Sequence, residues 1–138
     1  MRIMKATFVV LCVYTAFAWV QGHSAQPITG ASGLSDEQHF EVRFTSHLDP
    51  VAINTMHAWT LHIQDRSGKP VTDATVQVEG GMPDHDHGLP TQPRVTKNLG
   101  SGDYLLEGMK FHMGGWWQVT LLIQQGATSD RVTFDLNL

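Results

Sequence analysis

The sequence is poor in cysteine, and its only cysteine, Cys12, lies in an apolar N-terminal stretch. Residues 23–138 therefore contain no thiol. Such a chain forms no disulfide and has no cysteine nucleophile. Any site for a soft metal ion in it must be built from methionine and histidine.

Basic residues are also scarce, with nine lysines and arginines against thirteen acidic residues and a formal net charge of -4. Two of the nine, Arg2 and Lys5, precede the apolar stretch, so the charge falls to -6 when they are removed. Nucleic acid is excluded as a partner because its recognition requires clustered positive charge.

The opening "MRIMK" is followed by fifteen uncharged residues, which is the layout of a secretory signal peptide. We predict a signal peptide over residues 1–22, with cleavage after Ala18, Gly22 or Ala25. The apolar run is shorter than the roughly 20 residues that span a bilayer, so we expect no stable membrane span after cleavage. The expected location is outside the cytoplasm, in the periplasm.

Residues 23–36 are small, polar and interrupted by proline and glycine, which predicts a flexible linker. Residues 37–138 form the predicted domain. No helical stripe of useful length occurs in it, whereas an apolar period of two recurs, as in "FEVRF" and "WQVTLLI". The predicted strands lie at 40–44, 59–63, 75–78, 94–99, 103–108, 117–123 and 131–136.

About seven short strands with one apolar face each are best buried in a two-layer antiparallel sandwich, and we predict an all-β, immunoglobulin-like fold. Trp59 is expected in its core, and Tyr104 in "GSGDY" stands where a tyrosine corner could form. A small barrel is the alternative.

The run "GGMPDHDHGLPTQPRVT", followed by "LGSGDYLLEGMKFHMGGWWQVTLLI", resembles the YtkA-like family of exported bacterial domains, which is related to the FixH-type proteins. The resemblance is strongest over residues 78–124. It implies an immunoglobulin-like sandwich outside the cytoplasm, with links to copper handling or cytochrome oxidase assembly. FixH-type proteins keep an N-terminal membrane anchor, and this chain departs from them because its opening looks cleavable.

Two stretches carry an unusual density of metal-ligating side chains. "MPDHDHG" brings Met82, His85 and His87 into a short irregular loop, and "GMKFHMGG" contributes Met109 and Met113. Thioether sulfur is a good ligand for Cu(I) and a poor one for zinc or calcium, and imidazole suits copper in either oxidation state. The mixed set predicts a copper site, with Cu(I) favoured.

Three further histidines are reserve ligands. His112 would face away from Met109 and Met113 if the second stretch were a strand, and would turn inward if it were not. His57 precedes the tryptophan strand, and His23 could chelate copper with a free amine if cleavage followed Gly22.

The same residues have a structural interpretation, because methionine fills gaps in cores and histidines occur in turns. Under that interpretation the loop and the exposed Trp116 would form a protein-interaction module for a periplasmic or membrane partner, and the histidines would diverge. No nucleophile motif or phosphate loop is present, which predicts neither an enzyme nor an organic cofactor.

Overall fold

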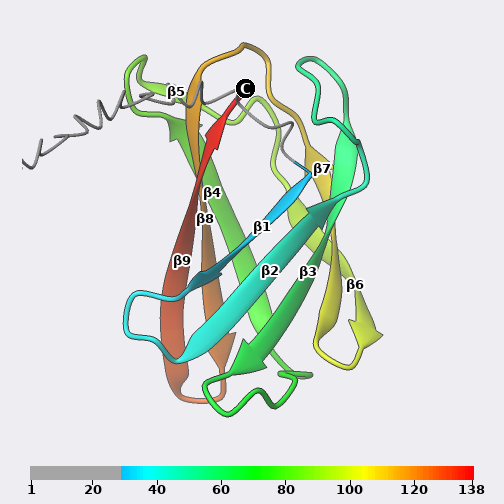
Figure 1. The fold of residues 1–138 in the computed structure, drawn as a ribbon, viewed down its shortest axis with the longest axis vertical. Coiled ribbons are helices and arrows are strands. Elements are labelled where there is room, and N and C mark those ends of the chain that lie inside the picture. The colour runs from blue at the N-terminus through cyan, green and yellow to red at the C-terminus, as the bar shows by residue number, and fades with distance from the viewer. Residues whose placement is uncertain (1–28) are drawn as a thin grey trace, which may run out of the picture.

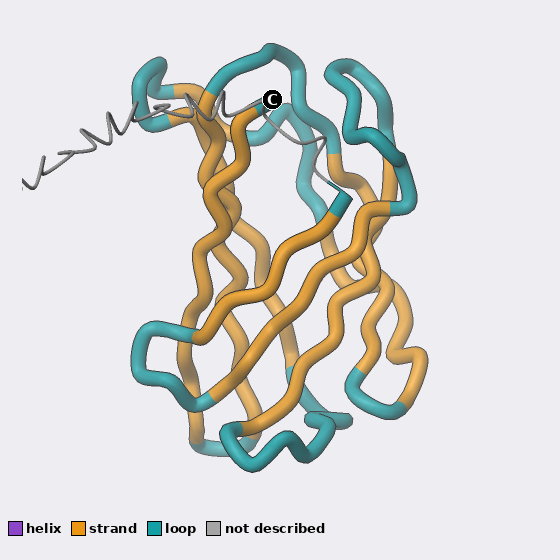
Figure 2. Tube along the Cα trace, viewed as in Figure 1, coloured by secondary structure: helices purple, strands orange, loops and turns teal. Residues whose placement is uncertain are grey.

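The computed structural model describes residues 29–138, which form nine strands and no helix (Figures 1 and 2). The strands are β1 (Gly30–Leu34), β2 (Phe40–Ser46), β3 (His57–Asp65), β4 (Thr75–Met82), β5 (His87–Gly88), β6 (Arg94–Gly100), β7 (Asp103–Met109), β8 (Trp116–Gln125) and β9 (Thr128–Asn137). All seven predicted strands are present. The additional ones are β1 and β5.

The strands form two antiparallel sheets, one in the order β1-β2-β3-β7-β6 and the other in the order β5-β4-β8-β9. In an immunoglobulin domain of the constant type, strands A-B-E-D face strands C-F-G. The order β2-β3-β7-β6 matches the first set and β4-β8-β9 matches the second. The predicted immunoglobulin-like sandwich is thereby confirmed.

The core lies between the sheets because each inner strand buries every second side chain. In β3, Trp59, Leu61 and Ile63 are fully buried, and Trp117 begins the same pattern in β8. Phe44 of β2 stacks on Trp59 with ring centroids 4.0 Å apart. This alternation is the period that the sequence displays.

Strand β1 corrects the prediction of a flexible linker over residues 23–36. Residues 30–34 pair with β2 through the whole strand, although four of the five residues are exposed. Gly30 lies so close to β2 that a Cβ atom there would come within 2.5 Å of the Phe44 carbonyl oxygen. Backbone pairing of small residues, without an apolar period, builds this strand. The predicted signal peptide (1–22) and residues 23–28 of the linker lie outside the described residues.

Tyr104 ties β7 to the β3–β4 connection rather than forming a tyrosine corner. Its hydroxyl donates to the Val71 carbonyl oxygen at 2.7 Å and accepts a hydrogen bond from the Ala74 amide at 3.1 Å. Both partners belong to the β3–β4 connection, some thirty residues upstream. In a tyrosine corner the bond reaches only a few residues back.

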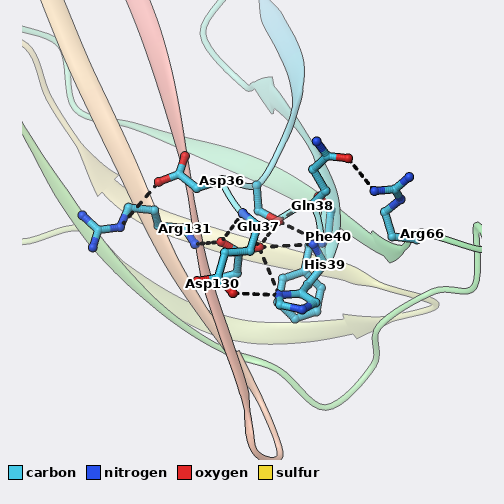
Figure 3. Close-up of polar contacts among 9 residues, drawn as sticks. Asp36, Glu37, Gln38, His39, Phe40, Arg66, Asp130 and Arg131 are labelled. Carbon is cyan, nitrogen blue, oxygen red and sulfur yellow. Dashed lines mark hydrogen bonds and ion pairs between the residues drawn. The ribbon is translucent and has the colours of Figure 1, made fainter.

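A buried carboxylate, Asp130 at the start of β9, fastens the turn between β1 and β2 to the second sheet (Figure 3). The Ser35 hydroxyl donates to it at 2.6 Å, and the backbone amides of Glu37, His39 and Arg131 donate at 2.8–3.2 Å. Burial opposes ionisation, but these hydrogen bonds outweigh it and lower the pKa of Asp130 to about 2. The turn is therefore held by an ionised carboxylate.

Substituting Asp130 should destabilise the fold. Asp130→Asn removes the charge and one acceptor oxygen, so we expect the free energy of unfolding at pH 7 to fall by about 2–3 kcal/mol in urea titrations. Asp36→Asn is the matched control, because that exposed carboxylate makes only a 3.7 Å ion pair with Arg131, worth less than about 1 kcal/mol.

The Asp130 contribution should also depend on pH. Its folded-state pKa of about 2 lies below the unfolded value of 3.8, so its contribution is complete above about pH 4 and is lost as the pH falls towards 2. The difference in stability between wild type and Asp130→Asn should shrink over that interval. An unchanged difference between pH 7 and pH 2 would contradict this assignment.

Candidate metal centre

Three connections meet at the end of the sandwich where the described chain ends. They are the β4–β5 turn, the β7–β8 connection over residues 110–115 and the β2–β3 connection over residues 47–56 (Figure 1). The Asn54 amide donates to the Phe111 carbonyl oxygen at 2.6 Å, and Gly115 exchanges two backbone hydrogen bonds with Leu138. These bonds fix the 110–115 segment between its neighbours.

The β4–β5 turn positions the first two histidines. The His85 amide donates to the Met82 carbonyl oxygen at 3.1 Å, and Asp86 adopts a positive φ of 51°, a conformation that aspartate tolerates better than most residues. The chain therefore reverses within four residues. The rings of His85 and His87 lie nearly parallel, with centroids 6.2 Å apart.

His112 brings a third imidazole to the same place. Its ring meets that of His87 edge to face at 5.6 Å, and it also contacts the indole of Trp117 at 5.3 Å. The Nδ1 atom of His112 is buried and has no hydrogen-bond partner. We call His85, His87 and His112 the histidine rim.

The spacing of these rings is close to what one metal ion requires. With metal–nitrogen distances of about 2 Å, two imidazoles on a tetrahedral ion have ring centres roughly 5 Å apart. Within residues 29–138, no three histidine, aspartate or glutamate side chains already stand in metal-binding geometry. The side chains of His85 and His87 are exposed, so their rings are free to rotate.

The predicted methionines do not converge on one point. Met82 and Met109 are fully buried in the core, whereas Met113 is half-buried. Met82 stands opposite His87 in the β4–β5 ladder, although Met82 is buried and His87 is exposed. Met109 stands opposite His57 between β3 and β7. The predicted ligands are thus divided into two groups.

The segment after Met109 is not a strand, which explains the position of His112. Strand β7 ends at Met109, and the chain then crosses between the sheets. The indole Nε1 of Trp117 donates to the Met113 carbonyl oxygen at 3.0 Å and fixes this crossing. His112 turns towards the β4–β5 turn, as expected for a non-strand conformation. His23 lies outside the described residues.

His57 is buried at the start of β3. Its Nδ1–H donates to the Thr55 carbonyl oxygen at 3.0 Å, which leaves Nε2 as the atom with the lone pair. Burial lowers the pKa of His57 below its usual value, although the bond to Thr55 acts in the opposite direction. The ring is therefore neutral at pH 7, and its Nε2 has no partner.

The surface beside the histidine rim is acidic and open. A depression of about 420 Å³ is lined by Glu79, Asp86, His87 and Gln118, among others, over the outer face of β4 and β8. Negative charge at this opening raises the local concentration of cations. His87 is therefore accessible to a metal ion from solvent.

Comparison with known proteins gives a family match. Residues 35–122, more than half of the chain, match the model of the YtkA-like family. The chain belongs to the YtkA-like family. The matched region contains both candidate loops of this YtkA-like chain, but it leaves out β1 and β9. No curated protein and no solved structure matches.

Among the described residues of the YtkA-like chain, no helix is long and apolar enough to cross a membrane. The relation to FixH-type proteins stays a prediction. The sequence prediction kept His112 only as a reserve ligand. If the segment were a strand, its side chain would point to the face opposite Met109 and Met113. The paired glycines at 114 and 115 were the available signal that the strand ends before them.

Gly115 should be hard to replace in this YtkA-like chain. Its φ is +122°, and a Cβ atom would lie 2.9 Å from the Cε atom of Met82. We expect Gly115→Ala to lower the free energy of unfolding by about 1–3 kcal/mol, measured by urea denaturation. Gly126→Ala is the control, because it has a positive φ but open space around it. Equal losses for both variants would refute the contact with Met82.

Proposed function

We propose that the chain is an exported copper-binding module that holds Cu(I) at the histidine rim, for storage, delivery or tolerance. One observation carries the proposal: two separate loops bring the ring of His87 next to those of His85 and His112, with ring centroids 6.2 Å and 5.6 Å away. Histidines that served only as turn residues would have no reason to converge across loops. The buried Nδ1 of His112 has no hydrogen-bond partner, so its lone pair is not used within the fold.

The neighbouring sulfur atoms favour copper over zinc. Met82 is the ladder partner of His87, and Met113 directly follows His112, so each of these two histidines has a methionine as its neighbour in the ladder or in the chain. Thioethers select Cu(I), whereas three imidazoles alone would also suit zinc. Asp84 and Asp86 are exposed and better suited to orienting imidazoles or meeting water. When bound, copper would act as cargo, and the chain's own residues hold and release it.

Exposure of the rim supports exchange of the metal. His85 and His87 lie on a short surface turn, whereas the strands below are fully packed. A site on a loop above a rigid scaffold can open without unfolding the domain. That arrangement suits an ion that is passed on rather than an ion that holds the fold together.

A docking role is the second candidate, and Trp116 supports it. Its side chain is 39% exposed at the start of β8, next to the 110–115 segment, and its indole donates to Asp135 at 2.8 Å. A fixed, exposed tryptophan is a common anchor in protein interfaces. The convergence of the histidines, however, departs from what a docking module alone predicts. A copper carrier must also dock, so the two roles are compatible.

Titration of Cu(I) against a chromophoric chelator under anaerobic conditions tests the proposal. The purified protein should withdraw copper, and His85→Ala/His87→Ala should lose more than about 100-fold in affinity because two ligands are removed. His112→Ala should weaken binding in the same direction. A chelator that keeps all its copper at every protein concentration would refute the metal-binding role.

The matched control is His47→Ala/His62→Ala, which removes two histidines outside the rim. His47 bonds to Thr60, and His62 pairs with Asp103 at 2.6 Å. This variant should retain wild-type copper affinity. Trp116→Ala should also retain it, and would lose only binding to a partner protein.

A further inference from the structure

The end of the sandwich contains one more imidazole, outside the histidine rim, that is arranged as a metal ligand would be. Metal-bound histidines usually donate their other ring N–H to a carbonyl or carboxylate, which fixes the tautomer and points the lone pair at the metal. His57 has this arrangement, with Nδ1 bonded to Thr55 at 3.0 Å and Nε2 buried without a partner. A buried acceptor without a partner costs free energy, so its retention requires an explanation.

The cross-strand neighbour of His57 carries a thioether sulfur, which is a soft metal ligand. Met109 stands directly opposite His57 in the β3–β7 ladder, and both residues are buried on the inner face. Directly opposite residues have Cβ atoms about 5 Å apart, within the reach of a methionine side chain. The ladder also shifts register beside His57, which re-aims side chains at this point.

The surroundings of the pair are aromatic. Phe111 and Trp59 lie against the His57 ring, with centroids 5.9 Å and 6.5 Å away. Aromatic faces stabilise a nearby cation and exclude water. A small monovalent ion with few ligands suits this environment better than a hydrated divalent ion.

We infer that His57 and Met109 form a second, buried site for a soft monovalent metal ion such as Cu(I), separate from the histidine rim. Between the two sites lie Phe111, whose ring contacts His57, and Trp117, whose ring contacts both Phe111 and His112. Met56 immediately precedes His57 and is exposed, so it offers a sulfur atom at the surface next to the buried pair. This inference does not rest on copper binding by the rim.

Silver(I) is a suitable probe because it is soft, monovalent and stable in oxidation state. The experiment follows the methionine ε-methyl and histidine ring signals by NMR in the purified protein and in His85→Ala/His87→Ala/His112→Ala. We expect the triple variant to bind one Ag(I), with shifts in the Met109 methyl and His57 ring signals. These signals should move in the wild type as well.

Two further variants keep the test independent of folding. Met109→Leu preserves volume and should fold, because such exchanges cost less than about 1.5 kcal/mol. In the triple-variant background it should weaken Ag(I) binding at least tenfold. Met82→Leu is the matched control: the same exchange at the other buried methionine should leave the remaining ion bound.

Unmoved Met109 and His57 signals at several equivalents of Ag(I) in the wild type would overturn the inference. A Met109 shift that persists in His57→Gln would overturn it as well. If only the histidine rim fails to bind the metal, the result is different. The wild type and the triple variant then each bind one Ag(I), and the Met109 signal still shifts.

Discussion

Packing of Trp117 at the end of β8 is the interaction on which this end of the molecule depends. The indole lies against Phe111 on its core side and against His112 on its outer side, with ring centroids 5.2 Å and 5.3 Å away. Its N–H also holds the Met113 carbonyl oxygen. One side chain thus closes the hydrophobic core, fixes the path of the 110–115 segment and supports the imidazole that meets His87.

The rigid scaffold and the candidate site lie in different parts of the molecule. Two antiparallel sheets give a rigid frame, and the residues with metal-binding chemistry lie on the connections at one end. Asp130 secures the β1–β2 turn with an ionised carboxylate, and Tyr104 joins β7 to the β3–β4 connection. Membership of the YtkA-like family agrees with this frame, and the chemistry argued for the loops belongs to their own side chains.

Sequence periodicity was sufficient for the fold because burial imposes a period of two on every strand that faces the core. It missed β1, whose pairing comes from the backbone of small residues. The site was predicted less well, because ligand type can be read from sequence but convergence cannot. Met109 and His87 are both good copper ligands, yet the β3–β7 ladder places Met109 opposite His57, whereas the crossing after β7 brings His112 to His87.

The uninterrupted pairing of β8 with β9 has a practical consequence. All ten residues of β8 are matched in register by β9, and the turn that joins them, at Gly126, has open space around it. Ten residues of strand span about 33 Å. A fluorophore attached at this turn would lie about 30 Å from Trp117 along a stiff strand pair, which suits energy-transfer measurements of movement at the other end.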